Sequence, residues 1–158
     1  MKIVLVQMTE KQWTMPAVHL ACALARSSSA NIILLQLIQE PHPSNLKQRF
    51  SFVSPPPQHD DIGEYAATAE DYGVHLSVRF MQCLSPLEAL SNAADQLNAD
   101  VVFAYVPQSW LPYWRKFQTW HLQRSLAAAH RQLFVLDQAA LDQLPSIVTK
   151  PDYLFNAK

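Results

Sequence analysis

Side chains suited to metal binding gather in only one segment of the sequence. His42, His59, Asp60 and Asp61 lie in a stretch rich in proline, without the spacing that places ligands on one face of a helix. Acidic residues are favoured at the start of a helix, so we interpret Asp60 and Asp61 as the beginning of one. The sequence therefore predicts no metal site.

Nucleophilic catalysis and phosphate binding need patterns that this chain lacks. Its 158 residues include only two glycines, Gly63 and Gly73, so the Gly-x-Ser-x-Gly turn of many hydrolases, the Walker loop and the dinucleotide-binding fingerprint are absent. Gln7, Met8 and Thr9 follow the first apolar run, where a receiver domain would carry acidic residues. We predict no catalytic residues and a protein that is not an enzyme.

The composition is that of one globular domain without a marked charge. Apolar residues make up 49% of the chain, and 12 basic against 13 acidic residues leave a net charge of −1. This balance favours neither nucleic acid nor an anionic membrane as a partner. Cys22 and Cys83 have no paired spacing, and no apolar run reaches the length of a membrane span. We expect a cytoplasmic, reduced protein that does not bind a membrane.

Short apolar runs alternate with segments of helical periodicity. The runs predict strands over residues 2–6, 31–38, 74–81, 100–106 and 132–136. Helices are predicted over residues 14–26, 62–72, 86–98 and 113–130, with Pro16 in a first turn, Gly73 ending the second helix, and Ser85 and Glu88 capping the third. The proline-rich residues 40–61 are expected to form a long surface loop.

This alternation predicts an α/β fold, because parallel strands need crossover helices that cover both faces of the sheet. We expect a single three-layer, Rossmann-like domain over residues 1–138, with a five-stranded parallel sheet of order 3-2-1-4-5 and a C-terminal tail over residues 139–158. The alternating strand at 74–81 is expected at a sheet edge. Ligands of such sheets bind beyond the carboxyl ends of strands one and four, where the strand order reverses.

Four short patterns occur along the chain in an order and at spacings that indicate a family. They are Ala30-Asn31 before IILLQL, Gly73-Val74, Pro86-Leu87-Glu88-Ala89-Leu90, and Ala99-Asp100-Val101-Val102. Over residues 2–137 the chain thereby resembles the universal stress protein family. The resemblance implies the adenine-nucleotide-alpha-hydrolase-like form of the Rossmann-like fold.

The resemblance also indicates where this chain departs from the family. Nucleotide-binding members carry glycines and a final Gly-Ser or Gly-Thr after strand four, and an acid at the end of strand one. Counting without gaps places Met8, Thr9 and Glu10 at the end of strand one, with Gln7 as the neighbour that could enter the site. The positions of the glycines and the final hydroxyl residue after strand four are Tyr105, Gln108, Gln118 and Thr119. Because glycine lets backbone N–H groups approach a phosphate, these larger residues predict that ATP is not bound in the family's manner and that no cofactor is held.

Two alternatives remain open for this crevice. Gln7, Thr9, Tyr105, Gln108 and Thr119 could form an altered site for a nucleotide or another small molecule, since glutamine side chains can supply hydrogen bonds where glycines supplied backbone. The chain could also be a nucleotide hydrolase of the wider fold group, which would show nucleotide turnover.

Aromatic residues crowd the segment where the phosphate loop would lie. They recur on one side of a predicted helix as Trp110, Tyr113, Trp114, Phe117 and Trp120. We predict that this face packs on the sheet and plugs the vacated crevice. The alternative is an exposed patch that recognises a partner protein or an apolar ligand.

The same segment is basic and contains no acid between Asp100 and Asp137. We interpret Arg115, Lys116, Arg124 and Arg131 as a solvated helix face, the alternative being a phosphate or nucleic-acid site. No RNA-binding motif accompanies them, so nucleic acid is not the expected partner.

The last predicted strand bears on assembly. The resemblance implies homodimers that pair this strand antiparallel across a two-fold axis, through Gln132, Leu133, Phe134, Val135 and Leu136. We therefore expect a stress-response or regulatory protein that acts without ATP, as a homodimer or by docking to an unknown protein partner.

Overall fold

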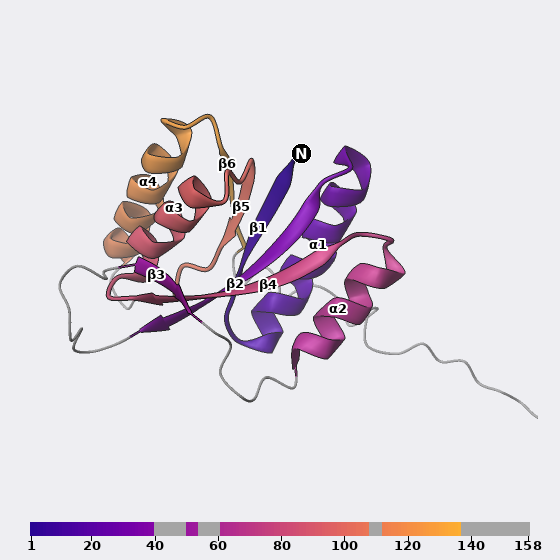
Figure 1. Cartoon of the computed structure of the whole chain (residues 1–158). Coiled ribbons are helices and arrows are strands. Elements are labelled where there is room, and N and C mark those ends of the chain that lie inside the picture. Colours follow the sequence, from indigo (N-terminus) through magenta and orange to yellow (C-terminus); the bar gives the residue numbers. More distant parts are fainter. Residues whose placement is uncertain (40–49, 54–60, 108–111, 137–158) are drawn as a thin grey trace, which may run out of the picture.

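The computed structural model describes residues 1–39, 50–53, 61–107 and 112–136 (Figure 1). In chain order the elements are β1 (Ile3–Met8), α1 (Lys11–Ser28), β2 (Asn31–Gln39), β3 (Phe50–Val53), α2 (Asp61–Asp71), β4 (Leu76–Cys83), α3 (Pro86–Gln96), β5 (Val101–Ala104), α4 (Pro112–Ala127) and β6 (Gln132–Val135). Figure 1 shows α1 and α2 on one face of the sheet and α3 and α4 on the other. The predicted three-layer α/β architecture is confirmed.

The strands form one sheet in the order β3-β4-β2-β1-β5-β6. The five parallel strands β4, β2, β1, β5 and β6 reproduce the predicted order 3-2-1-4-5. β1 pairs with β2 on one side and with β5 on the other, with Val4 aligned to both Ile32 and Val101. The strand order therefore reverses between β1 and β5, as expected.

One strand, β3, was not predicted, and it corrects two predictions. β3 lies inside the segment that was expected to be a loop, and it pairs antiparallel with β4, Phe50 opposite Cys83 and Val53 opposite Phe80. β4 is consequently not an edge strand. A four-residue strand among prolines leaves almost no periodic signal in a sequence. Such a short strand is not stable by itself, and its pairing with β4 stabilises it.

Two apolar cores form because β1, β2 and β5 are buried on both faces. One core lies between the sheet and α1 and α2, and its large members include Val6, Trp13, Ile32, Leu34 and Tyr65. The other lies between the sheet and α3 and α4, and includes Leu5, Leu35, Met81, Leu90, Val102 and Leu122. The continuous apolar runs of the sequence are therefore explained by burial on both faces.

Several element ends differ from the predictions. α1 begins at Lys11, so Pro16 lies inside the helix rather than in its first turn. Ser85 does precede α3 as its N-cap residue, but its side chain makes no capping hydrogen bond, so the predicted capping interaction is wrong. Gly73 has φ +68° after α2, as predicted. The predicted C-terminal tail, residues 139–158, lies outside the described residues.

Candidate functional site

The candidate site lies where β1 and β5 leave the sheet side by side. The first strand extends to Met8, so Gln7 and Met8 belong to β1 and Thr9 follows it directly, while Tyr105 follows the last residue of β5. Neighbouring parallel strands end at the same sheet edge, and a reversal of strand order opens a crevice there. The fold thus brings these four sequence-predicted residues to one place.

The side chain of Gln7 connects these two strand ends. It is only 6% exposed, and its Oε1 accepts a hydrogen bond of 3.0 Å from the backbone N–H of Tyr105. Phosphate-binding sites at such positions use free backbone N–H groups. Here the N–H of Tyr105 is already satisfied from within the protein.

Trp13 fills the space beside Tyr105. The indole is buried at the start of α1 and meets the Tyr105 ring edge-on, with 5.4 Å between the ring centroids. Its Nε1 donates a hydrogen bond of 3.3 Å to the carbonyl oxygen of Leu136, just beyond β6. Trp13 therefore ties α1 to the ends of β5 and β6 across the crevice.

Sequence reasoning missed Trp13 because the first helix was predicted to begin at Thr14, the residue after it. A start at Lys11 puts Trp13 on the same helix face as Ala17, Ala21 and Ala25, all of them buried. The spacing of four residues was present in the sequence and could have revealed its inward position.

Hydroxyl and amide groups surround the end of β1. The Thr9 N–H donates a hydrogen bond of 3.0 Å to Oγ1 of Thr14, which is fully buried. Burial raises the pKa of Tyr65 nearby, while a hydrogen bond with Thr14 lowers it in part. Within the described part of the chain, Oγ1 of Thr9 and Oε1 of Gln36 are buried and have no hydrogen-bond partner. Met8 pairs with Gln36 in the β1–β2 register, so both unpaired atoms lie at the same end of the sheet.

The structure does not bring Gln118 and Thr119 to a helix N-terminus. α4 begins at Pro112, so Thr119 lies seven residues inside it, a rise of about 10 Å at 1.5 Å per residue. Its Oγ1 donates a hydrogen bond of 2.9 Å to the carbonyl oxygen of Arg115 in the preceding turn. The gapless count from the family signature therefore misplaces these two residues, and Gln108 lies outside the described residues.

The aromatic side chains of α4 do not plug the crevice. Tyr113 is 82% exposed, and Trp114, Phe117 and Trp120 are 52–53% exposed. The residues of α4 that reach the core are Leu122 and Leu126 instead. The predicted packing of this face on the sheet is wrong for these four residues, and Trp110 lies outside the described residues.

The basic residues of this region differ in their surroundings. Arg131 donates a hydrogen bond to the carbonyl oxygen of Ala99 and pairs with Asp95, so it joins the end of α4 to α3. The Arg124 guanidinium lies over the Trp120 ring, 5.3 Å from its centroid. Lys116 and Arg124 are exposed, as predicted for a solvated helix face.

The described residues contain no group of three or more histidine, cysteine or acidic side chains that could hold a metal ion. His42, His59 and Asp60 of the predicted acidic and histidine-containing segment lie outside them. Asp61 is the first residue of α2, and its carboxylate lies 3.6 Å from Nζ of Lys11. Among the described helices, none is long and apolar enough to cross a membrane.

Comparison with known proteins gives matches at the level of structure. No protein-family model matches the sequence, and no curated protein matches it. The solved structures that resemble the chain include a universal stress protein in complex with cAMP, with a TM-score of 0.58, 16% identity, and coverage of 87% of this chain and 97% of that one.

Two further structures give the same result. A universal stress protein family member from Burkholderia pseudomallei has a TM-score of 0.54 and 15% identity, with 85% of this chain and 95% of that chain covered. A universal stress protein from Archaeoglobus fulgidus has a TM-score of 0.55 and 9% identity, with 87% and 94% covered. The resemblance read from the sequence is confirmed by these structures, and the chain has the universal stress protein fold.

Proposed function

We propose that this chain is a regulatory protein of the universal stress protein kind that acts without ATP, through contacts of its surface with a second copy or a partner protein. The observation that carries the proposal is the hydrogen bond between Gln7 and the N–H of Tyr105. A phosphate in the crevice would have to compete with a buried amide that is already in place.

The packing of Trp13 supports the same reading. Removing the indole from its contact with Tyr105 and from the carbonyl oxygen of Leu136 would expose apolar surface and leave a partly buried acceptor unpaired. A nucleotide that entered the crevice would have to offset both costs.

Exposed apolar side chains on two elements support action through surface contacts. Phe134 on the edge strand β6 is 41% exposed, and the aromatic side chains of α4 are at least half exposed. Exposed apolar groups that gather on one surface often mark sites of protein contact.

A thermal-shift panel of ATP, AMP, cAMP and apolar ligands tests the proposal. A ligand at 100 times its Kd stabilises a protein by about 2.7 kcal/mol, which is a readily measured rise in melting temperature. We expect no shift with ATP. A universal stress protein of the kind crystallised with cAMP serves as the positive control. A rise that grows with ATP concentration would contradict the proposal.

A second candidate function is favoured by the unpaired atoms beside the end of β1. Thr9 Oγ1 and Gln36 Oε1 could accept hydrogen bonds from a small polar ligand. Two of the universal stress protein structures that resemble this chain are complexes with cAMP and dAMP. A shift with AMP or cAMP but not with ATP would favour this altered site. Release of phosphate from ATP in the same samples would instead indicate the hydrolase alternative.

A further inference from the structure

The outer surface of α4 carries an apolar row that the fold leaves uncovered. Tyr113, Trp114, Phe117 and Trp120, which we call the aromatic face, point away from the two leucines that anchor the helix. Aromatic side chains bury large areas when they are covered, so four rings within two turns, each at least half exposed, are an unusual surface for an isolated protein.

The rings form a continuous row. The Phe117 centroid lies 5.8 Å from that of Trp114, 6.3 Å from that of Trp120 and 6.2 Å from that of His121. Arg124 extends the row over Trp120. Steps of three and four residues, as from 114 to 117, 121 and 124, are the spacing with which one helix packs along another.

The charge of α4 decides between possible occupants. The helix carries Arg115, Lys116 and Arg124 and contains no acidic residue. Two copies of α4 packed on each other would bring like charges together, which opposes self-association through this face. The complementary occupant is an anionic one.

The arrangement of the rings favours a protein over a nucleic acid. Bases bind by stacking on free ring faces, but here Trp114 and Phe117 stack on each other and Arg124 covers Trp120. The ring edges and outer surfaces that remain suit aliphatic side chains.

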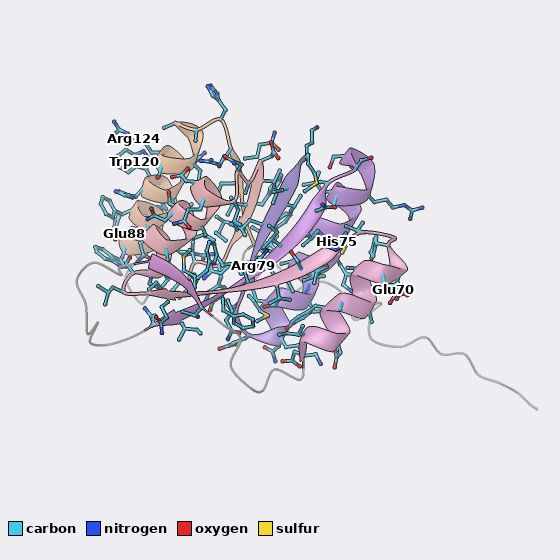
Figure 2. All side chains as sticks on the ribbon, viewed as in Figure 1. Glu70, His75, Arg79, Glu88, Trp120 and Arg124 are labelled. Carbon is cyan, nitrogen blue, oxygen red and sulfur yellow. The ribbon has the colours of Figure 1, made fainter. Side chains whose placement is uncertain are left out.

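A groove next to the row provides polar contacts for such a partner. It has a volume of about 200 Å³ between α3 and α4, and its lining includes Glu88, Ser91, Asn92, His121 and Ser125. His121 belongs to both the groove and the row. Figure 2 shows Glu88, Trp120 and Arg124 on the same side of the molecule, formed by α3 and α4.

We propose that the aromatic face docks an acidic amphipathic helix of a partner protein, whose apolar side packs on the rings while its carboxylates pair with Lys116 and Arg124. This inference rests on the proposed function in that the protein acts through surface contacts. It does not depend on whether the crevice between β1 and β5 binds a nucleotide, so the thermal-shift panel and the binding test below can fail separately.

The test measures the fluorescence anisotropy of a labelled synthetic helix with leucines at three- and four-residue spacing and glutamates elsewhere. We expect the protein to bind it, more weakly as salt is added. The double variant Lys116→Glu/Arg124→Glu should bind at least about tenfold more weakly. It should bind better to a matched peptide with lysines in place of the glutamates.

A second pair of variants separates the aromatic face from exposed apolar residues in general. Trp114→Ser/Phe117→Ser should abolish binding, whereas Leu20→Ser, on α1 at the opposite face of the sheet, should leave it unchanged. All the altered side chains are exposed, and circular dichroism checks that the fold is retained. Failure of the acidic peptide to bind, equal binding by all variants, or binding of single-stranded DNA or anionic lipid vesicles in its place would overturn the proposal.

Discussion

A glutamine side chain at the end of β1 takes the place that a ligand's acceptor group could occupy at the end of β5. Gln7 reaches the N–H of Tyr105, and Trp13 packs against the ring of the same residue. Backbone donors at the carboxyl edge of a parallel sheet are useful for binding only while they are free. These contacts engage the N–H and the ring of Tyr105 within the fold itself.

The hydrogen bond of Gln7 can be tested against a matched glutamine on the neighbouring strand. Gln7→Met leaves the N–H of Tyr105 without its acceptor, so we expect a loss of about 1–3 kcal/mol in the free energy of unfolding. Gln36→Met removes an Oε1 atom that has no partner among the described residues, and should cost less than about 1 kcal/mol. Urea unfolding of both variants gives the comparison. Equal losses would show that the Gln7 bond contributes nothing specific.

The buried thiols predict a pH dependence. Burial raises the pKa of Cys22 to about 11 and raises that of Cys83. In the unfolded chain a thiol ionises at lower pH, so above its ordinary pKa the folded state holds more protons and stability falls as the pH rises toward 11. Urea midpoints measured from pH 8 to pH 11 should decline, and less steeply in Cys22→Ala. An unchanged slope in that variant would contradict the assignment to Cys22.

At the scale of elements, α4 is attached to the fold along a narrow strip. Leu122 and Leu126 are its buried apolar residues, and Ser125 shares a hydrogen bond of 2.8 Å with Ser91 of α3. The aromatic face of the helix points outward. An element with few buried contacts opens more easily than the strands beneath it, which suits a surface that must adapt to a partner.

This attachment predicts that truncating two apolar residues of the same helix will change the free energy of unfolding by very different amounts. Leu126→Ala should reduce the free energy of unfolding by about 2–5 kcal/mol, because it leaves a cavity in the core. Phe117→Ala removes a larger side chain, yet should change stability by no more than about 0.5 kcal/mol, because the ring is half exposed. Urea unfolding measures both. A large loss with Phe117→Ala would mean that the aromatic face is packed in the isolated protein.

Element boundaries also show what the sequence could and could not predict. The doubly buried strands were predictable, because burial on both faces requires an unbroken apolar run such as residues 31–38. β3 and the start of α1 were not, since tertiary pairing fixes the first and no capping side chain marks the second. The error at α1 removed Trp13 from the predicted core, whereas the start of α4 was predicted to within one residue.

For the whole molecule, strand order follows from the alternation of elements, whereas the content of the site does not. The predicted order and the reversal between β1 and β5 were correct, so Gln7 and Tyr105 could be placed together from sequence. Their hydrogen bond could not be predicted, because it depends on a rotamer. The exposure of the α4 rings could not either, since helical spacing alone does not say which side of a mixed helix meets the sheet.

At the scale of the whole molecule, we predict that the edge strand β6 forms a dimer interface. β6 ends the strand order, and Phe134 stacks on Phe103 with 5.1 Å between ring centroids while remaining partly exposed. Antiparallel pairing of two β6 strands across a two-fold axis would satisfy the outer backbone groups of both and cover both Phe134 rings.

Sedimentation at micromolar concentration should therefore show a dimer. Phe134→Glu should convert it to monomers, because the two-fold axis would bring two carboxylates close together in an apolar contact. Phe117→Glu, the same change at a more exposed ring of α4, should leave the dimer intact, since like charges on α4 oppose self-association there. A monomeric parent protein would contradict the β6 interface. Dissociation by Phe117→Glu alone would move the interface to α4 and leave β6 as a free edge.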